Sequence, residues 1–177
     1  DKIFGLKSSQ KIPLNGFITA IEEDKSGNLW FASNGTGIAI FNQQQKRFTV
    51  LNHANSKLPI DKVQSISCDN AGRIWVGAQG GGLCLYKPQS QTFEIFDESF
   101  SLSNDVIYKI LEDSKGKFWV STNKGISSFD PEKKVFRNFS YYNGVLQSTF
   151  NIGSGLKTTD GQLFFGGLDG FNYFNPA

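Results

Sequence analysis

A seven-residue motif recurs four times along the chain, and its spacing restricts the possible folds more than anything else in the sequence. Each copy runs from an acidic or polar residue, through a glycine, to a large aromatic residue. The copies are Asp24–Trp30, Asp69–Trp75, Asp113–Trp119 and the weaker Thr158–Phe164, and their glycines lie 45, 44 and 45 positions apart. Internal periods of roughly 20–50 residues indicate solenoids, propellers or similar repeat arrays.

Further landmarks keep the same register in each copy. A second glycine follows the first by nine or ten positions, an aromatic residue comes four positions later, and three copies continue to another phenylalanine. These landmarks are Gly37, Gly82, Gly125 and Gly170; Phe41, Tyr86, Phe129 and Phe174; and Phe48, Phe93 and Phe136. Because so many positions stay in step, the four copies are true structural repeats.

Each repeat contains the pattern of four short strands. In the second repeat, Val63–Cys68 alternates apolar with small or polar residues, and Ile74–Ala78 follows a turn around Gly72. A run of three glycines then leads to Leu83–Tyr86, and a last turn leads to Thr92–Phe96. Short apolar or alternating runs bounded by turn residues predict strands, and the pattern shows no helical periodicity.

Four strands in about 45 residues correspond to one blade of a β-propeller. The abundance of Phe (17) and Gly (19) also favours an all-β protein. We therefore predict an all-β fold, a β-propeller fragment of four four-stranded blade repeats. The expected segments are 1–14, an outer strand of a preceding blade with its connection; 15–59, 60–103 and 104–149, three blade repeats; and 150–177, three strands of a fourth.

The repeated residues have expected structural roles. An Asp three positions before a Gly can bond the amides of its own turn, where Gly adopts the left-handed conformation. Trp30, Trp75 and Trp119 lie on the second strand of their repeats. We predict that these side chains pack one blade against the next; the alternative is a platform on which sugars stack.

The two ends of the chain suggest how the propeller closes. Residues Lys2–Leu6 resemble a fourth strand, because Phe4 precedes Ile18 by 14 positions, as Phe93 precedes Ile107. The last repeat stops after its third strand. The chain is thus expected to be a fragment of a larger protein whose ends pair within one mixed blade. Four blades could close alone, two chains could exchange end strands in an eight-bladed ring, or the fragment could stay open or assemble otherwise; we favour the homodimer.

Several classes of function are disfavoured by the residues present. His53 is the only histidine, so a Ser-His-Asp constellation is not expected, and it is interpreted as a solvated loop residue. Cys68 and Cys84 lack the spacing of a zinc site and fall on the first and third strands of one blade, too far apart for a disulfide. We expect no metal, no cofactor and no catalysis, with a paired-carboxylate glycosidase as a minor alternative.

Charge and hydropathy disfavour two kinds of partner. The net charge is +2 and the basic residues are scattered, so no nucleic acid is expected to bind this fragment. No stretch approaches the ~20 apolar residues of a membrane span, so no membrane contact is expected either.

The motif resembles a known repeat. Asp-x-x-Gly-x-[Leu/Ile/Phe]-Trp, followed by a turn with Gly, is similar to the two-component regulator propeller repeat, and Gly161–Pro176 resembles the last repeat before the immunoglobulin-like domain in those sensors. The resemblance implies a periplasmic sensor of a hybrid two-component system anchored in the inner membrane. It also implies neighbouring propeller and sandwich domains in the parent chain, a histidine kinase beyond them, and a response to oligosaccharides.

A ligand site is expected on the loops around the propeller axis, where blades vary. Amides and aromatic faces suit sugars, although Asn and Gly also simply form turns. We predict an oligosaccharide-responsive, non-catalytic sensor; the alternative is a scaffold for protein interaction or dimerisation without a small ligand. The candidate residues are Asn34, Gln79, Asn123 and Asp169 in turns, and Tyr141, Tyr142, Asn143 and Gln147 in the longest aromatic connection.

Overall fold

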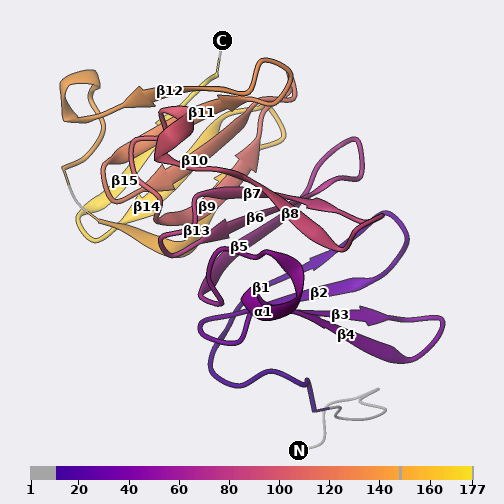
Figure 1. The fold of residues 1–177 in the computed structure, drawn as a ribbon. Helices are drawn as coiled ribbons and strands as arrows, with labels where there is room; N and C mark the ends of the chain where they lie inside the picture. Colours follow the sequence, from indigo (N-terminus) through magenta and orange to yellow (C-terminus); the bar gives the residue numbers. More distant parts are fainter. Residues whose placement is uncertain (1–10, 148, 177) are drawn as a thin grey trace, which may run out of the picture.

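The computed structural model describes residues 11–147 and 149–176, which form four antiparallel sheets in chain order (Figure 1). Blade 1 consists of β1 (Ile18–Glu23), β2 (Leu29–Ser33), β3 (Ile38–Asn42) and β4 (Arg47–Leu51). Blade 2 consists of β5 (Val63–Cys68), β6 (Ile74–Ala78), β7 (Leu83–Lys87) and β8 (Thr92–Phe96). Blade 3 consists of β9 (Ile107–Glu112), β10 (Phe118–Thr122), β11 (Gly125–Asp130) and β12 (Val135–Phe139), and blade 4 of β13 (Phe150–Lys157), β14 (Leu163–Gly167) and β15 (Gly170–Phe174). The predicted all-β propeller fragment of four blades is confirmed.

The blades follow one another in an arc, with the first strand of each blade on the inside (Figure 1). β1, β5, β9 and β13 lie side by side in that order, and β1 also approaches β13. β4, β8 and β12 form the outer edges of the first three blades. The expected strand at Lys2–Leu6 lies outside the described residues.

The repeated Asp organises the turn between the first two strands of a blade. In blade 2, Oδ1 of Asp69 accepts hydrogen bonds from the backbone N–H groups of Ala71 (2.9 Å) and Arg73 (2.7 Å). Its Oδ2 accepts one from Nε1 of Trp75 at 2.9 Å. Asp24 and Asp113 bond their own turns and Trp residues in the same way. The Asp carboxylate therefore links the turn to the Trp side chain six residues later, which lies at the interface between blades.

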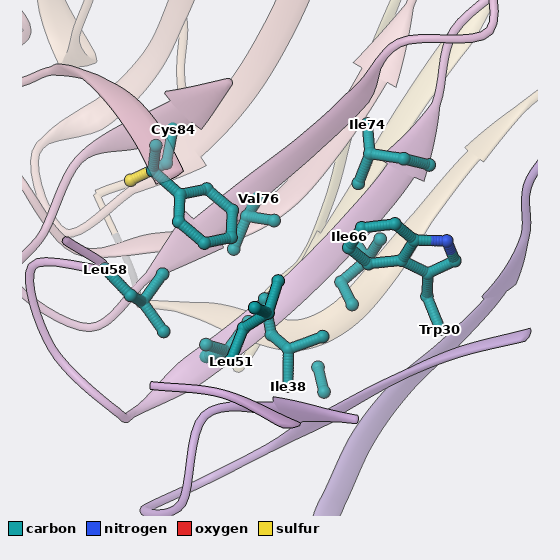
Figure 2. Packing of buried hydrophobic residues seen from close by; sticks show 11 residues of the cluster. Trp30, Ile38, Leu51, Leu58, Ile66, Ile74, Val76 and Cys84 are labelled. Carbon is teal, nitrogen blue, oxygen red and sulfur yellow. The ribbon is translucent and has the colours of Figure 1, made fainter. Parts of the chain in front are cut away.

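The Trp side chains pack between blades, as predicted. Trp30 of blade 1 contacts Tyr86 of blade 2, with ring centroids 5.0 Å apart, and Trp119 of blade 3 contacts Phe174 of blade 4 at 4.7 Å. Figure 2 shows the indole of Trp30 against Ile66 and Ile74 of the next blade. Each of the three clusters of buried residues draws on two successive blades, so every core is shared.

The connections between blades contain short helices that the sequence reading did not predict. His53, expected in a loop, begins the helix α1 (His53–Ser56), and 3₁₀ turns lie at Glu98–Phe100 (η1) and Tyr141–Asn143 (η2). Asn52 caps α1 by accepting from Ala54 N at 3.0 Å. The His53 side chain is exposed, as expected, with Nδ1 3.6 Å from Oδ2 of Asp61. Capping residues at three- to four-residue helices are easily read as loop residues.

The two cysteines are free thiols on β5 and β7, Cys68 half-buried and Cys84 buried. Burial raises the pKa of both thiols. They pack as small apolar residues in the core shared by blades 1 and 2.

Gly77 on β6 marks a point of close approach between blades. A Cβ added there would lie 2.5 Å from Cγ2 and 3.0 Å from Cβ of Ile107 on β9. We expect Gly77→Ala to lower the free energy of unfolding by about 1–3 kcal/mol, because the branched Ile107 cannot turn away. Urea denaturation measures this loss.

The matched control is Gly166→Ala, at the same position of blade 4. Its Cβ would meet chiefly the hydroxyl of Ser154 at 2.2 Å, and that hydroxyl can rotate away. We expect a much smaller effect at Gly166, and equal losses at the two positions would contradict the packing argument.

Candidate ligand site between blades 3 and 4

The turns between the second and third strands form one rim with the connections between blades. In blade 1, the N–H groups of Gly35 and Gly37 donate to the carbonyl oxygen of Asp61 at 3.1 and 2.9 Å. In blade 2, Gly80 and Gly82 donate in the same way to the carbonyl oxygen of Asp105 at 3.0 and 2.9 Å. These bonds close the rim between blades 1 and 2 and between blades 2 and 3.

The rim is built differently between blades 3 and 4. Only Asn123 and Lys124 separate β10 from β11, whereas four residues occupy the equivalent turns of blades 1 and 2. Isolated bridges join Asn34 to Lys62 and Gln79 to Val106; in the described part of the chain, no such bridge joins Asn123 to Thr149. The shorter turn thus distinguishes this junction from the two before it.

A cavity of about 310 Å³ occupies this junction. That volume lies at the lower end of the range typical of small-molecule sites. It is lined by Asn123, Lys124, Gly125, Ser140, Tyr141, Leu146, Gln147 and Thr149.

The lining combines amides, hydroxyls, one ammonium group and one aromatic face. Oδ1 of Asn123 accepts a hydrogen bond from the hydroxyl of Tyr108 on β9 at 2.5 Å, which orients the amide, whose NH₂ group can donate. Burial raises the pKa of Tyr108, so its hydroxyl stays protonated and keeps donating. Tyr141 is 62% exposed and offers a ring for stacking. Such a set suits a polyhydroxylated ligand.

The structure brings three of the eight candidate residues together, namely Asn123, Tyr141 and Gln147. The other five lie elsewhere. Tyr142 is 95% exposed beside the cavity, and the Asn143 side chain accepts from Ser140 N at 3.1 Å as part of the cap of η2. Asn34, Gln79 and Asp169 lie in the turns of blades 1, 2 and 4.

Sequence reasoning missed four of the lining side chains, those of Lys124, Ser140, Leu146 and Thr149. The signal was present in the glycine spacing. Gly116 and Gly125 are nine positions apart, whereas the corresponding glycines of the first two repeats are ten apart. A shortened turn marks the junction where the repeat pattern changes.

The described residues hold no group of three or more His, Cys, Asp or Glu side chains placed to bind a metal ion. None of their helices is long and apolar enough to cross a membrane.

Comparison with solved structures shows the same fold in proteins of different activities. The extracellular domain of a protein described as a hybrid two component system from B. thetaiotaomicron is 24% identical over 99% of this chain, with a TM-score of 0.64. A second such domain from that organism is 23% identical over 90% of the chain, with a TM-score of 0.73. The chain spans only 30% and 23% of these two domains.

An enzyme shares the fold as well. Virginiamycin B lyase from Staphylococcus aureus is 16% identical over 94% of this chain and 58% of its own, with a TM-score of 0.67. The fold alone is therefore compatible with both sensing and catalysis. No match was found among the curated proteins.

The family comparison is more specific. The model of the two component regulator propeller matches residues 12–35, 57–80 and 101–124. Each match contains the Asp-turn of its repeat and runs to the turn after the second strand. Three segments of the chain, one in each of the first three repeats, thus match the two component regulator propeller.

Proposed function

We propose that this chain is the non-catalytic, ligand-sensing portion of a hybrid two-component receptor, and that an oligosaccharide binds between blades 3 and 4. The observation that carries the proposal is the cavity at the junction of blades 3 and 4, where the turn is shorter than at the two other described junctions. The family of the repeats supports the signalling role, and the similarity to extracellular sensor domains supports a periplasmic location.

The proposed signal is a change in how the blades and their neighbours pack. Asn123 and Lys124 come from blade 3, whereas Gln147 and Thr149 belong to the connection that enters blade 4. A ligand touching both sides binds some arrangements of the two blades better than others. The ligand can shift the equilibrium between these arrangements only by the difference in its affinity for them.

Tyr141 provides the test of the site. We expect wild-type protein to bind one class of oligosaccharide in a calorimetric panel, and Tyr141→Ala and Gln147→Ala to weaken that binding at least tenfold. A tenfold loss corresponds to about 1.4 kcal/mol. A ligand at 100 times its Kd adds about 2.7 kcal/mol of stability, so thermal shift offers a second readout.

The neighbouring Tyr142 supplies the matched control, because it is the same residue type and does not line the cavity. Gln79→Ala controls for Gln147 at a junction that is closed. Silence across a broad panel, or equal losses at Tyr141 and Tyr142, would count against the proposal.

A scaffold function is the second candidate, favoured by exposed apolar side chains on the two end blades. Ile21 on β1 is 61% exposed, and Leu156 on β13 is 61% exposed. Exposed apolar side chains that gather into a patch mark interaction sites.

A further inference from the structure

The outer edge of blade 4 differs from the edges of the other blades. β4, β8 and β12 each pair with the third strand of their sheet, whereas no described strand pairs with the outer side of β15. An open edge strand presents unpaired N–H and C=O groups and accepts a further strand readily.

A second cavity, of about 370 Å³, adjoins this edge. Its apolar lining includes Trp119 and Phe139 from blade 3, Val145 from the connection, and Phe174 from β15. Trp119 is only half-buried here, whereas Trp30 and Trp75 are buried. A cavity of about 150 Å³ already accommodates a benzene ring, so this one has room for a large aromatic side chain.

The other blades show what occupies the equivalent place. Phe93 on β8 packs on Tyr86 at 5.4 Å within the core that contains Trp30. Phe136 on β12 packs on Phe129 at 4.6 Å against the core that contains Trp75. Phe174 holds the position of Tyr86 and Phe129 in blade 4. The cavity is therefore the place for a phenylalanine from a fourth strand.

We propose that the N-terminal segment Ile3–Leu6 of a second copy of this chain pairs with β15 and inserts Phe4 into this cavity. Phe4 lies 14 positions before Ile18, the same step as from Phe93 to Ile107. The ten residues before Lys11 lie outside the described structure and are long enough for one strand. The described chain begins beside blade 1 at the bottom of Figure 1, whereas β15 lies at the upper left, which favours a second copy over the chain's own segment.

The two end faces fit such an exchange. Phe171 and Tyr173 on β15 are 59% and 62% exposed, yet the residues at the position of Phe171 in the other blades are buried. On blade 1, Ile21 is exposed, while its counterparts Ile66 and Ile110 are buried. Head-to-tail contact of two copies would bury the face of blade 4 in one copy against the face of blade 1 in the other, as the interfaces within one chain do. If each copy gives its N-terminal segment to the other, the two chains close an eight-bladed ring.

The mass of the chain in solution tests the exchange. Light scattering after gel filtration is expected to give twice the 19.6 kDa chain mass for wild type. Deletion of residues 1–10, or Phe4→Asp, is expected to shift the protein to monomer, while Ser9→Asp leaves the dimer intact. A monomeric wild type, or a dimer that survives both changes, overturns the proposal.

A second measurement covers the case in which the deleted chain folds poorly. A labelled peptide of residues 1–10 is expected to bind the deletion variant and raise its Tm, and the same peptide with Phe4→Asp is not. Failure of the unmodified peptide to bind a folded deletion variant overturns the insertion of Phe4. This outcome is independent of any oligosaccharide.

Discussion

Replacing Asp69 by alanine is expected to lower the free energy of unfolding by about 3 kcal/mol. The side chain is buried, and its two oxygens accept from Ala71 N, Arg73 N and Trp75 Nε1. Arg73 Nε also donates to Oδ2 at 2.6 Å. Removing the carboxylate leaves these donors without their acceptor, and each lost bond to a charged group costs about 1.5–3 kcal/mol before relaxation. Urea denaturation at neutral pH measures the loss.

The loss should depend on pH. Burial alone raises the pKa of Asp69, but the bonds from Trp75 and Arg73 outweigh it and leave the pKa below its usual value. The carboxylate therefore stabilises the fold fully above the unfolded-state pKa of about 3.9, and this contribution disappears as the pH falls through the lower folded pKa. The difference in stability between wild type and Asp69→Ala should narrow in acid.

Asp160, in the corresponding turn of blade 4, is the matched control. It is exposed, and Thr158 takes the place of the buried Asp there by accepting from Gln162 N at 2.9 Å. Phe164 replaces Trp, and its ring, unlike an indole, has no N–H group that needs an acceptor. We expect Asp160→Ala to change stability little. Comparable losses at Asp69 and Asp160 would show that the buried network is not responsible.

Trp75→Ala is expected to cost more, about 3–5 kcal/mol. The ring is 1% exposed and contacts Phe118 at 4.4 Å, Phe129 at 5.8 Å and Phe96 at 6.1 Å. Its removal opens a cavity between blades 2 and 3 and also deprives Asp69 of a donor. Chemical denaturation followed by circular dichroism gives the difference.

Trp119→Ala is the comparison, because Trp119 holds the same position in blade 3 but is half-buried beside the cavity at β15. A smaller loss is expected there. The double variant Asp69→Ala/Trp75→Ala should lose less than the two single losses combined, since the pair shares one hydrogen bond. Strict additivity would contradict this coupling.

The repeat made the blades predictable from sequence, because each strand and turn is dictated by local signals that recur. The Asp-turns at Asp24, Asp69 and Asp113 and the interblade Trp residues were all assigned correctly for this reason. The position of a side chain within one blade follows from its position in the others.

The candidate site was predictable only in part, because it depends on a departure from the repeat. Asn123 is one of four equivalent turn residues, and only the shorter spacing from Gly116 to Gly125 separates its turn from those of Asn34 and Gln79. That Tyr141 and Gln147 line the same cavity as Asn123 depends on how separate segments pack, which the pattern within one repeat does not predict. The helix α1 was missed because its four residues carry no periodicity.

The sharing of every buried cluster between two successive blades has a consequence for how such proteins change in size. Every blade packs one face against the blade before it and the opposite face against the blade after it. An added repeat with the same two faces would therefore find a matching partner on each side. Stability then resembles a sum of nearest-neighbour contributions. Duplication or loss of a whole repeat within the gene would leave every remaining interface chemically intact, so the number of blades can drift in evolution while the blade itself is preserved.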